Sequence, residues 1–251
     1  MNRLQKIFSK NKKVLIIFDS GGAPNMEESE KRLENIIENG ADIVELGIPF
    51  SDPVADGPVI QAASQQAIAN GATLEKILEM ALRIRKRHTE TGLIIFGYYN
   101  IFLQYGLEKF FSRLAEISID GVLIVDLPFE ERKELQPFTE KYHIPQITLI
   151  GPSTDLDRAR VLTAQAEGFV YCINARGVTG LRKELPAELG ERLKTLRSVS
   201  PVPVAAGFGI SDPESAAAAA EHADGIIVGS AAVKLPLPEL GVFIRQLKNK
   251  L

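Results

Sequence analysis

The feature that most constrains the fold of this chain is the regular recurrence of short apolar runs. Eight runs rich in Val, Ile and Leu alternate with amphipathic segments of helical length. Their nearly continuous apolar character is typical of parallel strands that are covered on both faces. We therefore expect strand–helix alternation and a parallel α/β fold. The expected strands are 14–18, 42–46, 93–97, 121–125, 144–150, 168–173, 202–207 and 225–229.

The segments between these runs carry helix signals. Residues 26–40, MEESEKRLENIIENG, open with acidic side chains and close on glycine, which matches the helix dipole and a glycine stop. Residues 130–142 contain Pro137, which should break or kink a helix there. SDPE at 211–214 supplies a helix N-cap followed by a proline. The first thirteen residues precede the first strand, and we expect them to form a helix at the bottom of the sheet.

The number of strands favours a closed (β/α)8 TIM barrel over an open doubly wound sheet. Eight strand–helix units in 251 residues match the usual size of this barrel, and no linker interrupts them. We therefore predict a single barrel domain over residues 1–251 with an extra N-terminal helix.

Composition excludes several functions. A formal net charge of −3 leaves no basic footprint for nucleic acid, and no uncharged apolar run reaches the ~20 residues of a membrane span. The chain shows no signal peptide, and its only cysteine, Cys172, lies in an apolar run; we expect a buried, inert thiol and a cytoplasmic protein. The three histidines, His88, His143 and His222, lie too far apart for a zinc motif, so no metal site is predicted.

Acidic side chains follow the second expected strand. Glu45 lies near the end of that strand, flanked by apolar residues, where burial would raise its pKa toward a useful acid–base range. The proline-rich loop 49–58 then holds Asp52 and Asp56 in a defined place. From position alone, Glu45 could equally face outward, and Asp–Pro and Asp–Gly are common turn formers.

Three glycine-rich turns follow the last strands, at 176–180, 207–214 and 228–233. Glycines let backbone N–H groups approach a phosphate, and the loops after strands 7 and 8 are the usual phosphate seat of this fold. Tyr98 and Asp126 add polar groups at the same mouth, although Asp126 could be a helix cap. The chain lacks the glycine motifs of nucleotide sites, so we expect acid–base chemistry on a small phosphorylated metabolite, without metal or nucleotide.

Six motifs, in this order, cover most of the chain from about residue 14 to 234. They are ELGIPFSDPVADGPVIQ (45–61), GYYN (97–100), VDLP (125–128), RGVTG (176–180), AGFGIS (206–211) and VGSA (228–231). Together they resemble the tryptophan synthase alpha subunit family. The resemblance implies cleavage of indole-3-glycerol phosphate to indole and glyceraldehyde 3-phosphate, a retro-aldol reaction of tryptophan biosynthesis.

The resemblance also implies roles for individual residues. Glu45 matches the general acid–base glutamate, and Asp56 matches the aspartate that serves the indole nitrogen. Thr179 matches a threonine of a loop that closes over substrate and touches that aspartate. Tyr171 would lie beside the glycerol chain. The remaining substrate-binding positions, in the indole pocket and phosphate seat, are Phe18, Ile60, Phe96, Tyr98, Leu123, Gly180, Phe208, Gly209, Gly229 and Ser230.

The family implies a partner, a pyridoxal-phosphate-dependent beta subunit in an αββα complex, and no cofactor on this chain. We expect the loops 49–58 and 99–106, including Phe102, to form an apolar docking patch. Two alternatives stand beside the lyase. One is a mainly regulatory subunit that activates the beta chain and has weak lyase activity. The other is a barrel enzyme acting on other sugar phosphates, which would want a Schiff-base lysine or a metal cluster at the strand ends.

This chain departs from the family pattern in two places. After the first strand, FDSGGAP (18–24) replaces the usual F-I-T-A-G-D-P, so Asp19 stands in place of an apolar residue and Ser20 in place of a threonine. In the loop after strand 6, NARGVTG shifts the basic residue by one position, with Ala175 and Arg176.

Overall fold

The eight strands form one parallel sheet. The computed structural model describes residues 2–173, 187–207 and 209–251. The strands are β1 (Val14–Ser20), β2 (Ile43–Gly47), β3 (Gly92–Gly97), β4 (Gly121–Ile124), β5 (Thr148–Ile150), β6 (Val170–Ile173), β7 (Val204–Gly207) and β8 (Gly225–Val228). Their order is β4-β3-β2-β1-β8-β7-β6-β5. The edges meet just before β5, where the Ile147 N–H donates to the Val122 carbonyl at 2.8 Å. The predicted TIM barrel is confirmed.

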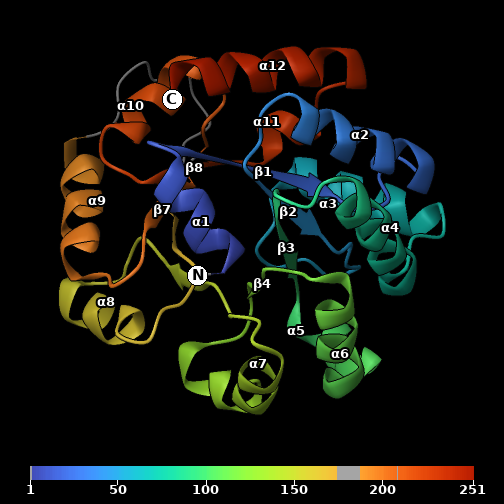
Figure 1. Cartoon of the computed structure of the whole chain (residues 1–251), viewed down its shortest axis with the longest axis horizontal. Helices are drawn as coiled ribbons and strands as arrows, with labels where there is room; N and C mark the ends of the chain where they lie inside the picture. The colour runs from blue at the N-terminus through green and yellow to red at the C-terminus, as the bar shows by residue number, and fades with distance from the viewer. Residues whose placement is uncertain (1, 174–186, 208) are drawn as a thin grey trace.

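Helices surround the sheet, and one lies in the middle of the ring (Figure 1). They are α1 (Arg3–Lys10), α2 (Met26–Glu38), α3 (Pro58–Ala69), α4 (Leu74–Arg87), α5 (Tyr99–Tyr105), α6 (Leu107–Ile117), η1 (Phe129–Glu134), α7 (Gln136–Tyr142), α8 (Leu156–Thr163), α9 (Ala187–Val199), α10 (Pro213–Ala220), α11 (Ser230–Val233) and α12 (Leu237–Lys250). The central helix is α1, as expected for the residues before the first strand.

Several boundaries follow from local chemistry. Pro137 breaks its segment as predicted: η1 ends at Glu134, and Pro137 lies in the first turn of α7, where a missing N–H costs no helical bond. Two helices, α3 and α4, lie between β2 and β3. The α3 helix begins at Pro58, so the loop that carries Asp56 ends where this helix starts.

The barrel interior is filled by side chains from the strands and α1. Leu4 and Ile7 of α1 pack beneath the inward-facing residues. Glycine at the start of β3 makes room for them, because a Cβ on Gly92 would lie 3.2 Å from side-chain atoms of both. The α1 helix therefore closes the amino-terminal end of the barrel. The inner cluster consists of Leu4, Ile7, Val14, Ile16, Ile43, Ile94, Leu123, Ile147, Phe169, Ala205 and Ile227.

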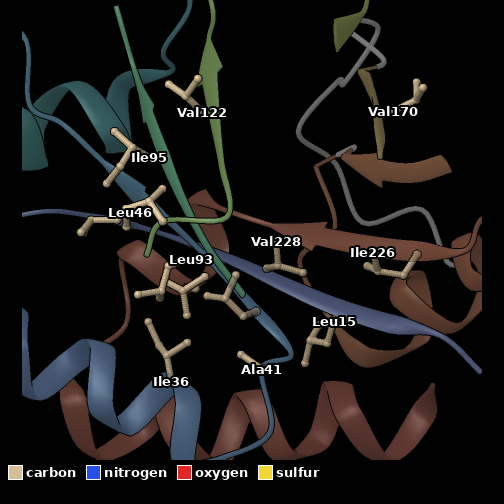
Figure 2. Close-up of a cluster of buried hydrophobic side chains, with 14 of the residues drawn as sticks. Leu15, Ile36, Ala41, Leu46, Leu93, Ile95, Val122, Val170, Ile226 and Val228 are labelled. Carbon is tan, nitrogen blue, oxygen red and sulfur yellow. The ribbon is translucent and has the colours of Figure 1, made fainter. Parts of the chain in front are cut away.

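A second, larger apolar layer lies between the strands and the outer helices. Side chains alternate in direction along each strand, so Leu15, Leu46 and Val228 face this layer while their neighbours face inward. Figure 2 shows these side chains together with Ile36 of α2. Two apolar faces on each strand explain why the runs read as continuous in the sequence. A polar side chain on the inner face is therefore conspicuous, and it needs a separate explanation.

Candidate active site

Glu45 lies inside the barrel. Its neighbours Val44 and Leu46 pack in the outer layer, whereas Glu45 shares the inner face with Ile43. The side chain is fully buried at 0% exposure, and neither carboxylate oxygen has a hydrogen-bond partner among the described residues. Burial raises the pKa of Glu45 to about 8. The sequence-based expectation of a desolvated glutamate is confirmed, and the group can hold or release a proton near neutral pH.

Two aromatic residues lie near this carboxyl group. Phe18 of β1 is paired with Glu45 in the sheet register. Tyr171 of β6 has a raised pKa, first because it is buried and then because of the negative charge of Glu45. Its ring covers Gly207 of β7, where a Cβ would lie 2.5 Å from a ring atom. Tyr171 and Glu45 therefore share the interior of the barrel.

Tyr98 holds the loop that carries Asp56. The Tyr98 ring stacks on Phe50 at a centroid distance of 4.9 Å, and its hydroxyl accepts the Ala55 N–H at 3.0 Å. Burial raises the pKa of the half-buried Asp56, and a hydrogen bond with Tyr98 opposes that rise. Tyr98 itself is only 2% exposed. The structure thus shows Tyr98 fastening the loop that carries Asp56, a function that its sequence position did not reveal.

Apolar residues predicted for the indole pocket line neighbouring strands. The rings of Phe18 and Phe96 meet edge to face at 5.0 Å, and Phe96 is paired with Leu123 in the register. Leu123 is fully buried in the inner cluster. Ile60 lies in the first turn of α3 and is half-buried. Phe18, Phe96 and Leu123 are brought together by strand pairing, while Ile60 comes from the segment directly after Asp56.

The two glycine-rich turns after β7 and β8 differ in their helix starts. The α10 helix is capped by its own Asp212, which accepts the Ser215 N–H at 2.8 Å, so a carboxylate already occupies that end. The α11 helix begins after Gly229 without a side-chain cap. Gly229 is half-buried and Ser230 is exposed. An incoming phosphate would therefore meet less competition at α11 than at α10.

Several predicted positions lie outside the part of the chain that the structure describes. Thr179, Gly180 and Phe208 lie outside the described residues, as do Ala175 and Arg176. Gly209 follows β7 with a φ of +39°, which favours glycine.

Phe102 was expected on an exposed docking loop, and that expectation is wrong. The residues after β3 form the helix α5, and Phe102 is fully buried, stacked on Phe110 at 4.3 Å. Of the residues predicted for the docking patch, its neighbour Leu103 is 48% exposed and Val54 is 85% exposed.

Other groups at the mouth have structural roles. Asp126 accepts the Tyr99 N–H at the start of α5, at 2.8 Å from its Oδ1. The alternative expectation, that it caps the helix after it, is wrong, because η1 begins after Pro128 without a side-chain cap. Cys172 is buried as predicted, and burial raises the pKa of its thiol. Within the described part of the chain, no group of three or more potential ligands could hold a metal ion. No helix there is long and apolar enough to cross a membrane.

These features define a TIM barrel with a buried, unpartnered carboxyl group on the inner face of its strands. The family model for the tryptophan synthase alpha chain matches residues 4–238. The alpha chain of Halalkalibacterium halodurans is 45% identical over 94% of this chain and 88% of its own length. That of Geobacter sulfurreducens is 43% identical over 94% and 90%.

Solved structures agree with these relatives. The alpha subunit of Legionella pneumophila superposes with a TM-score of 0.91 at 34% identity, over 100% of this chain and 98% of that one. A tryptophan synthase structure from Mycobacterium tuberculosis gives a TM-score of 0.92 at 30% identity, over 99% and 98%. This chain belongs to the tryptophan synthase alpha chain family. It is a carbon–carbon lyase that cleaves indole-3-glycerol phosphate in tryptophan biosynthesis.

Proposed function

We propose that Glu45 and Asp56 carry out the cleavage of indole-3-glycerol phosphate in this chain. The observation that carries the proposal is the buried, unpartnered carboxyl group of Glu45 on the inner face of the barrel, with its pKa near 8. Within this hydrophobic interior, an ordinary carboxylate would be strongly disfavoured without a partner. A proton-transfer role explains why the chain keeps an acid there.

The reaction requires two proton movements around one carbon–carbon bond. Indole C3 accepts a proton, and the hydroxyl next to the breaking bond loses one. The electrons of that O–H bond then form the aldehyde carbonyl, and the carbon–carbon electrons return to the indole ring. A glutamate with a pKa near 8 can donate the first proton and accept the second, so the residue ends the cycle protonated as it began.

Asp56 supplies charge stabilisation. Protonation at C3 leaves positive charge on the indole nitrogen, and a fixed carboxylate that accepts the N–H stabilises that intermediate. Tyr98 holds the Asp56 loop through the Ala55 N–H, which limits the reorganisation that stabilisation would otherwise need. Four apolar side chains would surround the indole ring: Phe18, Ile60, Phe96 and Leu123. Tyr98 would lie beside Asp56 in the same pocket.

The phosphate group would be held at the turn between β8 and α11. Gly229 and Ser230 open a helix with no side-chain cap, and the first amides of a helix have no acceptor within it. Gly209, which follows β7, would belong to the same phosphate-binding site. Thr179, Gly180 and Phe208 remain predicted members of the site by family resemblance. Recognition through backbone amides suits a phosphate monoester and requires no cofactor on this chain.

We further propose docking to a pyridoxal-phosphate-dependent beta subunit in an αββα complex, in the cytoplasm. The exposed large apolar side chains of Val54, in the loop that carries Asp56, and Leu103, in α5, support the docking face; they are 85% and 48% exposed. Indole is neutral and apolar, so covering this mouth would retain it for the next reaction. Docking at the Asp56 loop would also couple the partner to cleavage, and such coupling is reciprocal for binding.

The test is indole release from indole-3-glycerol phosphate by the purified chain, with and without a beta subunit. Wild type and Glu79→Gln, which alters an exposed glutamate on α4, should release indole at equal rates. Glu45→Gln should lose at least ~10²-fold in turnover. Indole release by Glu45→Gln at the wild-type rate would remove Glu45 from the mechanism. Release only in the presence of a beta subunit would favour the mainly regulatory role.

A further inference from the structure

A buried ion pair joins the end of β1 to α2. The Arg32 guanidinium donates from Nε to Asp19 Oδ2 at 3.0 Å and from Nη2 to Asp19 Oδ1 at 3.0 Å. Arg32 is 7% exposed and Asp19 is 2% exposed. This two-bond fork fixes orientation as well as distance.

The same guanidinium reaches the carboxyl-terminal end of α11. Nη2 donates to the Ala232 carbonyl at 3.1 Å, and Nη1 donates to the Leu235 carbonyl at 2.6 Å. The Val233 carbonyl lies 3.4 Å from Nη2. The last carbonyls of a helix have no donor within the helix, and they attract positive charge. Arg32 therefore fastens the end of α11 to β1 through Asp19.

The amino-terminal end of this segment lies against the same strand. A Cβ built on Gly229 would lie 3.7 Å from the Cβ of Phe18, so this glycine packs beside Phe18. Phe18 and Asp19 are consecutive on β1 and face opposite sides of the sheet. The strand β1 thus holds both ends of residues 229–235. Phe18 contacts Gly229 at the first end, and Asp19 acts on the other end through Arg32.

We propose that Asp19 and Arg32 are positioning residues for phosphate binding. They hold α11 so that the backbone amides at Gly229 and Ser230 meet the phosphate of the substrate. Neither side chain touches the substrate, because both lie outside the barrel wall. This inference rests on the proposed function, which assigns the phosphate to the β8–α11 turn.

The chain offers a matched control at the other end of the barrel. Arg85 of α4 is 6% exposed and donates from Nη2 to Asp120 Oδ2 at 2.7 Å. Its Nη1 donates to the carbonyls of His88 at 3.0 Å and Thr91 at 2.7 Å. Asp120 also accepts the N–H of Leu93 near the start of β3. Arg85 therefore repeats the chemistry of Arg32, an aspartate and several carbonyls, far from the strand ends that carry Glu45.

The experiment compares Arg32→Met, Arg85→Met and the double variant Asp19→Val/Arg32→Met. For each, it measures the melting temperature, the Kd for inorganic phosphate, and kcat and KM for indole-3-glycerol phosphate. Both single variants should melt lower. Arg32→Met leaves Asp19 buried without its partner, and Arg85→Met leaves Asp120 with one of its two arginine partners, Arg3. Arg32→Met should raise the phosphate Kd and the KM about tenfold or more, with kcat within about threefold. Arg85→Met should leave all three constants unchanged.

The double variant separates positioning from stability. Removing both charges should recover much of the melting temperature, while phosphate affinity stays weak because α11 still lacks its fastening. Wild-type phosphate affinity in the double variant would show that the pair serves stability alone. Equal weakening by Arg85→Met would attribute the effect to general destabilisation, and would overturn the proposal too.

A wild-type measurement separates this inference from the function on which it rests. The unaltered chain should bind inorganic phosphate and should prefer indole-3-glycerol phosphate to dephosphorylated indole glycerol. If it did neither, the phosphate seat itself would be wrong, and the positioning role would fall with it. If it did both while Arg32→Met behaved as wild type, only the positioning role would fail.

Discussion

Replacing Glu45 by glutamine should make this protein more stable and much less active. The folded chain keeps a proton on Glu45 up to a pH of about 8, whereas an ordinary glutamate releases it near 4.5. Between these values the folded state binds more protons than the unfolded state, so stability falls as the pH rises. Glutamine does not titrate in this range, so the stability of the Glu45→Gln variant does not fall in this way as the pH rises.

The size of the effect follows from the two pKa values. The difference between about 8 and 4.5 corresponds to roughly 5 kcal/mol at high pH, at 1.36 kcal/mol per pH unit. By the same linkage, the buried carboxyl group lowers the free energy of unfolding of the wild type by about 3 kcal/mol at pH 7, about 1 kcal/mol at pH 5 and almost nothing at pH 4. For a chain of this length, about 3 kcal/mol corresponds to a melting temperature roughly 6–12 °C higher. Both neutral side chains leave buried polar atoms unpaired, so that contribution largely cancels.

The assay is thermal unfolding of wild type and Glu45→Gln at pH 4, 5 and 7, together with indole release at pH 7. The melting temperatures should coincide at pH 4 and separate as the pH rises, while turnover falls at least ~10²-fold at pH 7. The exposed Glu79→Gln variant controls for loss of a carboxylate and should show no pH-dependent separation. A melting-temperature difference that stayed the same from pH 4 to pH 7 would refute the reasoning that burial keeps Glu45 protonated.

Outcomes are also expected for four other substitutions. Asp56→Asn should lower kcat by about 10²–10³-fold while changing KM less, because the amide cannot offset charge on the indole ring. Steady-state kinetics measure both constants. A change mainly in KM would make Asp56 a binding group. Gly229→Ala should raise KM by roughly 10–100-fold, because the added methyl group would hold the phosphate away from the backbone amides. That methyl lies 3.7 Å from the nearest side-chain atom, so a melting curve should show a folded chain. An unchanged KM would place the phosphate elsewhere. Val54→Asp should weaken binding to a cognate beta subunit about tenfold or more in a titration. Undiminished binding by this variant would place the interface on another face. Phe102→Asp should instead unfold the chain, because it buries a charge.

The fold and the burial of Glu45 could be predicted from local sequence patterns. Continuous apolar runs separated by amphipathic segments specify parallel strands covered on both faces, because each strand must bury two sides. Two-residue alternation then places Glu45 on the same face as Ile43, and burial follows from the closed barrel. Pro137 broke its segment as predicted, between η1 and α7, since the effect of proline on the backbone is local.

The tertiary structure decided which side chains meet across elements distant in the chain. A residue such as Phe102 reads as an exposed loop aromatic until α5 packs it on Phe110. Tyr98 reads as a mouth residue until its hydroxyl is seen to accept the Ala55 N–H. Arg32 shares the buried face of α2 with Leu33, which marks it as needing a partner, but only the packing of α2 on β1 and α11 identifies Asp19 and the α11 carbonyls. Local patterns specify the direction of a side chain along its own element, whereas long-range partners depend on how elements pack, and the spacing of residues in the sequence does not encode that packing.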